Sequence, residues 1–82
     1  MTEQYKDISS LSDDELDALL MAQVKTRQLK VAMVIAMAMR PYETWDEERV
    51  GRRIIALVEA GKVEAFGDVR KWRFSEIRLP DK

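Results

Sequence analysis

The sequence predicts an α+β domain of three helices followed by a C-terminal β-hairpin, and three observations lead to this fold class. Apolar residues recur at helical spacing along the chain as far as residue 60. Gly61 then stands where a helix would end in a left-handed residue. After Gly61 the apolar period changes to two, as in strands. Three helices that lead into a hairpin have the order of a winged helix, so we expect a winged-helix-like domain over residues 11–82 and a flexible tail over residues 1–10.

The composition narrows the classes of function. The chain has 82 residues, of which 46% are hydrophobic and 35% charged, as expected of one small folded domain. It has no cysteine and no histidine, so the commonest metal ligands and the commonest general base are missing. We therefore expect no enzyme activity and no cofactor or metal, and no small-molecule ligand is evident.

The start of the chain has no basic end and apolar run of the kind that makes a signal peptide. The longest apolar run, residues 31–39, is far shorter than the roughly 20 residues of a membrane-spanning helix. We expect a cytoplasmic protein that does not bind membranes.

The first helix begins after Ser12. Ser12 as N-cap and Glu15 three residues later form a capping box. Asp13, Asp14 and Asp17 lie in the opening turns, where the helix dipole favours negative charge. These acids are therefore explained without a metal.

The second helix is predicted over residues 27–39, because the segment is rich in helix formers and Pro41 disfavours helical geometry at Arg40. It is apolar nearly all round, which favours a central helix that is buried on several sides. A second interpretation is that Met33 and Met37, four residues apart, offer an adaptable face to a partner or to a second copy of the chain.

The third helix is predicted to begin near Thr44 or Asp46 and to end at Gly61. Gly51 lies inside it and costs roughly 1 kcal/mol against alanine. We expect another stretch of backbone to approach closely at this glycine.

The hairpin is predicted to turn at Asp68-Val69 and to pair Val63 with Phe74, Glu64 with Arg73 and Ala65 with Trp72. In this register Trp72 and Phe74 cover the hairpin against the helices. Ile77 and Leu79 have the opposite parity, which requires a bulge near Ser75-Glu76 or a strand that crosses onto the domain body.

The C-terminal part of the chain resembles a family of bacterial domains of unknown function, often found at the end of longer proteins. The likeness covers roughly residues 29–79. The residues that carry it are Gly61, Gly67, Asp68, Arg70, Arg73, Ser75, Glu76, Arg78 and Leu79. The resemblance implies no activity.

Basic residues of the third helix and the hairpin are the candidate contacts to a partner or to nucleic acid: Arg49, Arg52, Arg53, Lys71, Arg73 and Arg78. In helix-turn-helix proteins the start of the recognition helix enters the major groove. Here that start carries Asp46, Glu47 and Glu48, which would repel DNA. Nucleic-acid binding is therefore disfavoured.

The simpler interpretation of these arginines is a solvated charged face. Asp46 precedes Arg49 by three residues and Glu48 precedes Arg52 by four, and both spacings favour ion pairs on a helix. Arg53 has no such partner on its own helix. A protein-facing surface is the next interpretation and DNA contact the last.

Ser75, Glu76 and Arg78 form either a small polar site or a structural ion-pair network, and the sequence leaves this open. The function we predict is a noncatalytic protein-interaction domain that binds a protein partner or forms a homodimer. The alternative is a winged-helix DNA-binding transcriptional regulator.

Overall fold

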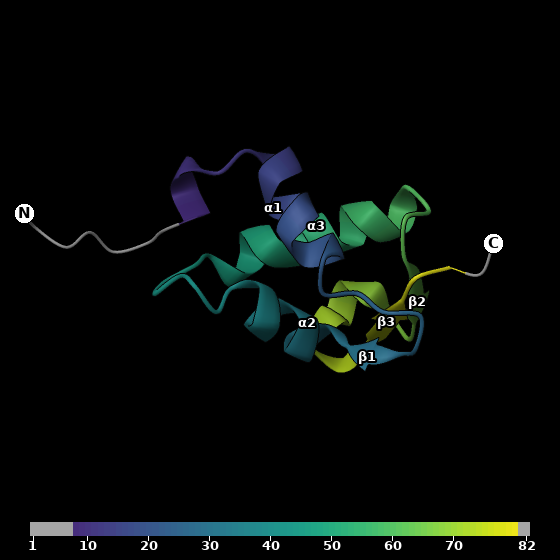
Figure 1. Cartoon of the computed structure of the whole chain (residues 1–82). Helices are drawn as coiled ribbons and strands as arrows, with labels where there is room; N and C mark the ends of the chain where they lie inside the picture. Colours follow the sequence, from purple (N-terminus) through teal and green to yellow (C-terminus); the bar gives the residue numbers. More distant parts are fainter. Residues whose placement is uncertain (1–7, 81–82) are drawn as a thin grey trace, which may run out of the picture.

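The computed structural model describes residues 8–80 and has the winged-helix-like α+β fold. Residues 1–7, most of the expected tail, lie outside the described residues. In chain order the elements are η1 (Ile8–Ser10), α1 (Asp13–Met21), β1 (Leu29–Lys30), α2 (Val31–Ala38), α3 (Glu47–Glu59), β2 (Glu64–Phe66), η2 (Val69–Phe74) and β3 (Glu76–Arg78). Helix α1 packs across α3, and the three strands gather at one end of the molecule (Figure 1).

The start of α1 confirms the predicted capping box. The Ser12 hydroxyl accepts from the Glu15 amide at 3.0 Å, and the Ser12 amide donates to Glu15 Oε1 at 2.8 Å. The chain before this cap is part of the fold as well, because residues 8–10 form a 3-10 turn and Ile8 is buried. The folded domain therefore begins earlier than residue 11.

The prediction of a helix over residues 27–39 is wrong at its start, because Leu29–Lys30 form strand β1. Leu29 pairs with Ile77 and Lys30 with Glu76, and the Val31 amide donates to the carbonyl of Ser75 at 3.0 Å. Pairing with a distant strand overrides local helix propensity in these residues. The helix that follows buries Val31, Val34, Ile35 and Ala38 and leaves Ala32, Met33 and Ala36 exposed.

Helix α3 has the predicted limits. The Asp46 carboxylate accepts from the amides of Glu48 and Arg49, at 2.9 and 3.3 Å, and is the N-cap. Gly61 has a φ of 78°. The amides of Gly61 and Lys62 bond back to the carbonyls of Val58 and Leu57, which is the Schellman arrangement.

The predicted hairpin register is wrong. Strand β3 runs antiparallel between β1 and β2, and it pairs Glu64 with Arg78, Ala65 with Ile77 and Phe66 with Glu76. Strand β3 therefore begins near Ser75-Glu76, where the alternation of apolar residues in the sequence shifts by one position. Ile77, which follows this shift, is buried. Residues 71–74, which the sequence placed in the second strand, lie instead in the 3-10 helix η2.

Local contacts explain why η2 forms. The Asp68 carboxylate accepts from the Arg70 amide at 3.0 Å and caps its start. At its end, the amide and hydroxyl of Ser75 both bond to the Trp72 carbonyl. Trp72 packs against the core, whereas Phe74 is 86% exposed, so the prediction that both rings cover the hairpin is correct only for Trp72.

The core lies between the three helices and the sheet. Its fully buried side chains come from each helix and from β3, and they include Leu16, Leu20, Val34, Ile54 and Ile77. Helix η2 contacts both α2 and α3, so the segment between the last two strands folds back onto the helices. This placement creates a hollow on the surface between η2, α2 and the start of α3.

Candidate functional site

Arg49 joins α3 to the N-terminal elements. Its Nη1 atom donates to the carbonyl oxygen of Ile8 at 2.8 Å, and its Nη2 atom donates to that of Leu11 at 2.7 Å. Nη2 also lies 3.1 Å from Asp13 Oδ1. The Arg49 guanidinium is therefore held by its own chain and oriented toward η1 and α1.

Arg53 has the partner that its own helix does not supply. Its Nε and Nη2 atoms donate to the two carboxylate oxygens of Asp17 on α1, at 2.9 and 2.8 Å, and Nη1 lies 3.5 Å from Asp13. The hydrogen bond to Asp17 is the main cause that raises the pKa of Arg53 above its ordinary value. Because an arginine with a raised pKa stays charged until strongly alkaline pH, its contribution to stability is constant through neutral pH.

Arg52 forms the predicted pair with Glu48, at 3.8 Å, on the exposed side of α3. The companion prediction, a pair of Asp46 with the Arg49 side chain, is not what the structure shows. Asp46 bonds to backbone amides at the helix start, and the Arg49 side chain turns to α1. The Asp46 carboxylate therefore caps the helix and does not form the ion pair that the helical spacing predicted.

Of the candidate basic residues after α3, Arg73 and Arg78 form ion pairs with acids of the same chain. Arg73 forms an ion pair with Glu47, and its guanidinium lies 4.8 Å from the centre of the Trp72 ring. Arg78 donates to Glu64 at 2.8 Å and lies over Phe66. Lys71 is exposed and has no ion pair within residues 8–80. Five of the six candidate basic side chains are thus next to an acid of the same chain.

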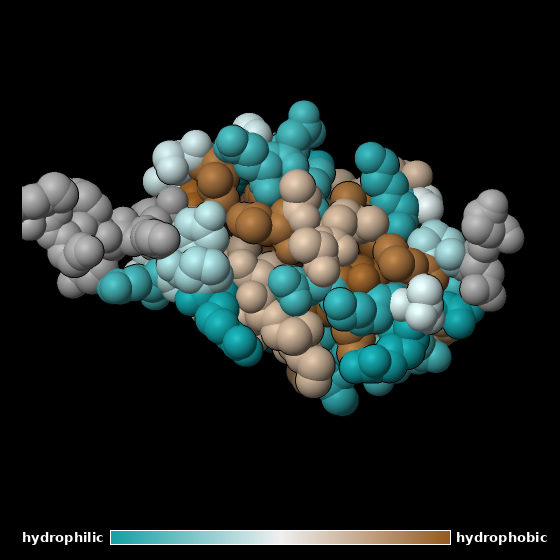
Figure 2. Space-filling view, in the orientation of Figure 1, coloured by the Kyte–Doolittle hydropathy of each residue, from teal (hydrophilic) through white to brown (hydrophobic). Residues whose placement is uncertain are grey.

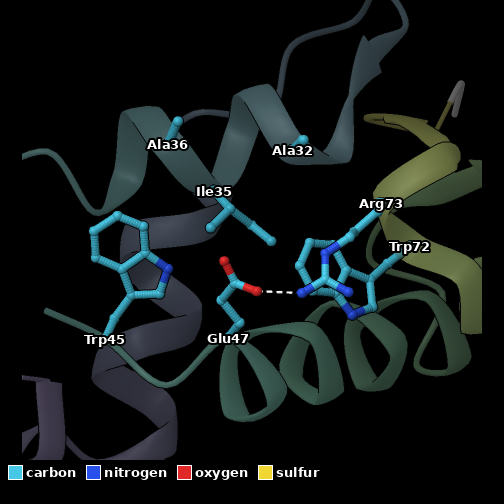
Figure 3. A pocket seen from close by; sticks show the side chains of 7 residues that line it. All are labelled: Ala32, Ile35, Ala36, Trp45, Glu47, Trp72 and Arg73. Atoms are coloured by element: carbon cyan, nitrogen blue, oxygen red, sulfur yellow. Dashed lines mark hydrogen bonds and ion pairs between the residues drawn. The ribbon is translucent and has the colours of Figure 1, made fainter.

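A pocket of about 350 Å³ opens between α2, η2 and the start of α3. Its walls are Ala32, Ile35, Ala36, Trp45, Glu47, Trp72 and Arg73. Figure 3 shows the two tryptophans on opposite sides, the alanines and Ile35 above them on α2, and the ion pair of Glu47 and Arg73 between them. The walls are mostly apolar, and the small alanines leave the space open.

Gly51 explains how Trp72 reaches its position beside the pocket. A Cβ atom at residue 51 would lie 2.1 Å from Trp72 Nε1, far inside contact distance. The close approach predicted at Gly51 therefore exists, but a tryptophan side chain makes it and not another stretch of backbone. Trp45, on the opposite wall, has a buried Nε1 atom without an acceptor in the described part of the chain.

The side chains of Ser75, Glu76 and Arg78 have different partners in the structure. Ser75 is buried and its hydroxyl bonds to the Trp72 carbonyl at 3.2 Å. Glu76 accepts from Gln28 Nε2 at 2.6 Å, whereas Arg78 pairs with Glu64. The three residues do not form one polar site, and their bonds connect neighbouring strands and loops.

Of the residues that line the pocket, only Arg73 was predicted from the sequence as a contact residue. Trp45, Ala32, Ala36 and Phe74 were not predicted as contact residues, although they line or border the hollow surface. The only available signal was at Trp45, which stands directly before the N-cap Asp46, a position from which an apolar side chain packs against the helix start. Two exposed alanines on a helix carry no signal of their own.

Comparisons with protein-family models, with curated proteins and with solved structures find no match. The resemblance at the C-terminal end of the chain therefore stays a prediction. The fold and the geometry of the surface are accordingly the basis for a functional proposal.

We also searched residues 8–80 for a metal site and for a membrane-spanning helix. Within residues 8–80, no group of three or more acidic, histidine or cysteine side chains is placed to hold a metal ion. No helix in this part of the chain is both long and apolar enough to cross a bilayer.

Proposed function

We propose that this chain is a noncatalytic protein-interaction module and that it binds through the outer side of α2 together with the pocket beside it. The observation that carries the proposal is the pocket, whose walls are two alanines, an isoleucine and two tryptophans together with the ion pair of Glu47 and Arg73. Tryptophan is enriched at the energetic centres of protein interfaces, in well-packed pockets surrounded by polar groups. The cytoplasm stays the predicted location.

The surface around the pocket supports the same function. Met33 is 48% exposed and Phe74 is 86% exposed, and both adjoin elements that build the pocket. Figure 2 shows weakly hydrophobic surface over α2, bordered by hydrophilic side chains. An apolar area with a polar rim is the usual composition of a protein-binding surface.

The charge arrangement disfavours the alternative of a DNA-binding regulator. Arg49 and Arg53 are bound to α1, and Arg73 is bound to Glu47 at the start of α3. A DNA phosphate would have to displace these carboxylates and approach the acids at residues 46–48. Lys71 is the one candidate base without an acid neighbour in the described part of the chain, and it favours DNA only weakly.

Site-specific photo-crosslinking in living cells tests the proposal. A benzoylphenylalanine at Met33 should give light-dependent adducts with protein, because that residue is exposed on α2 and follows Ala32, which lines the pocket. The same probe at Glu59, an exposed residue at the far end of α3, is the matched control and should give none. Equal adduct patterns at the two positions would contradict the proposed surface.

Fluorescence anisotropy with labelled duplex DNA tests the alternative. We expect no binding at low salt up to high micromolar protein. Binding that falls steeply with added salt and weakens in Lys71→Glu would replace the interaction module by the DNA-binding regulator.

A further inference from the structure

We infer that the occupant of the pocket is a second copy of this chain, and that Phe74 of each copy enters the pocket of the other around a two-fold axis. The inference rests on the proposed function, because it names the partner of the same surface. A two-fold interface needs a surface that is complementary to itself. Residues 8–80 carry both halves of such a surface side by side.

The projecting half is Phe74. It is 86% exposed although it is the last residue of a segment that is anchored on both sides. Trp72 packs against the core before it, and Ser75 after it is buried and bonds through its amide and hydroxyl to the Trp72 carbonyl. The phenyl ring is thus held in water by its neighbours, an arrangement that costs free energy unless another surface covers it.

The receiving half is the pocket. Its volume of about 350 Å³ is sufficient for an aromatic ring, and its apolar walls would replace the water around that ring. Trp45 and Trp72 stand on opposite walls, where aromatic edges and faces can contact an incoming phenyl group. Phe74 of the same chain is not part of these walls, so the pocket does not hold its own Phe74.

The charges on either side of the pocket are complementary. Arg70 and Lys71 precede Phe74 and line one shallow hollow with it. Arg70 lies 3.6 Å from Asp68, whereas Lys71 has no ion pair within residues 8–80, so Lys71 is the basic group that can meet a partner's acid. On the other side of the pocket, Glu43 and Glu47 line a hollow with Trp45. When Phe74 of one copy enters the pocket of the other, its basic flank meets the acidic flank of the partner, and the symmetry repeats the contact.

This self-complementarity favours a second copy over an unrelated protein. A heterologous partner would have to supply both a side chain for the pocket and a surface that covers Phe74, whereas a second copy of this chain carries both. Association would also add buried apolar surface to a small domain, whose single core provides limited stability.

Sedimentation equilibrium of the purified full chain is the first test. We expect a concentration-dependent monomer–dimer equilibrium, and Phe74→Ser should raise the dimer dissociation constant at least tenfold. Phe74 is exposed, so the variant should keep the fold, which circular dichroism checks. Lys62→Glu is the control for an exposed change away from the surface and should dimerise as the wild type does.

A mixing experiment tests the reciprocal insertion. Ala36→Trp fills the pocket but keeps Phe74, whereas Phe74→Ser keeps the pocket open. Each variant alone should be mainly monomeric. Their mixture should associate more tightly than either variant, because one Phe74 still finds one open pocket. A mixture no tighter than its components overturns the insertion.

Charge reversal tests the orientation of the two copies. Lys71→Glu and Glu43→Lys should each weaken the dimer several-fold. The double variant should recover the dimer, because each copy again meets an opposite charge. Failure of the double variant to recover overturns the proposed pairing.

The outcomes separate this inference from the proposed function. A wild-type chain that stays monomeric up to millimolar concentration would overturn the inference that a second copy occupies the pocket. The formation of species larger than a dimer would overturn it as well. If the monomeric chain still gives protein adducts from Met33 and none from Glu59, the proposed function stands and only the occupant is wrong.

Discussion

Trp72 lies against α3 at Gly51, and this contact determines how the segment between the last two strands packs. The indole fills the space that any side chain at residue 51 would require, since a Cβ atom there would lie 2.1 Å from Nε1. The glycine is therefore retained inside a helix at a cost in helix propensity. The gain is an aromatic side chain that is half-buried against the core and also forms one wall of the pocket.

Gly51→Ala should destabilise the domain by about 1–3 kcal/mol, because the added methyl group forces Trp72 out of its place. Urea unfolding measures the change. The informative control is the same substitution in a Trp72→Ala background, where alanine should be neutral or stabilising by up to about 1 kcal/mol, from its better helix propensity. Equal effects in both backgrounds would show that Trp72 is not the cause.

Arg53 and Arg52 are neighbours in sequence but differ in environment. Arg53→Ala should cost about 1.5–3 kcal/mol, because its two short hydrogen bonds to Asp17 are charge-assisted and partly buried. Arg52→Ala should change stability by less than about 0.5 kcal/mol, since its pair with Glu48 is exposed. Urea unfolding of the two variants side by side tests this, and similar losses would contradict the assignment.

The elements differ in how far local sequence determines them. Helix α1 has its start specified by a capping box, and α3 has its limits specified by Asp46 and Gly61. Strand β1 has no comparable signal, and residues 29–30 extend because they pair with β3. Helix η2 has the N-cap Asp68, but the sequence equally assigns Asp68 to a hairpin turn. The packing of Trp72 against the core and the contacts of η2 with α2 and α3 favour the helix over the strand.

Ser12→Ala should destabilise the domain by about 1 kcal/mol, because it removes the side chain that accepts from the Glu15 amide. Thermal unfolding followed by circular dichroism measures the loss. Ser10→Ala, an exposed serine in the preceding turn, is the control and should stay within about 0.5 kcal/mol of the wild type. If the two variants lose equal stability, the cap is not the source.

The arrangement of charge belongs to the whole molecule. Acids concentrate in residues 1–25 and bases in residues 62–78, so the linear sequence predicts a mild dipole. The fold neutralises much of it, since Asp13 and Asp17 of α1 bind Arg49 and Arg53 of α3, and Glu47 binds Arg73. Next to the pocket, Lys71 lies in one shallow hollow and Glu43 in another, so a basic and an acidic side chain stand on either side of it.

If the chain dimerises through Phe74, its melting temperature should depend on protein concentration. We expect a rise of a few degrees for each tenfold increase in concentration, because folding and association are linked by mass action. Differential scanning calorimetry over a hundredfold range measures this. Phe74→Ser should remove the dependence, and a wild-type chain with a constant melting temperature would contradict the linkage.

The sequence by itself determined the fold class, the start of α1 and both limits of α3. These features depend on side chains that act on their own helix, namely Ser12 and Glu15, Asp46, and Gly61, and such local bonds can be identified from spacing. The tertiary structure alone decided the strand register, the packing of η2 against α2 and α3, the partners of Arg49 and Arg53, and the pocket. Each of these depends on residues that are distant in the chain and meet only after packing, so no local pattern specifies them.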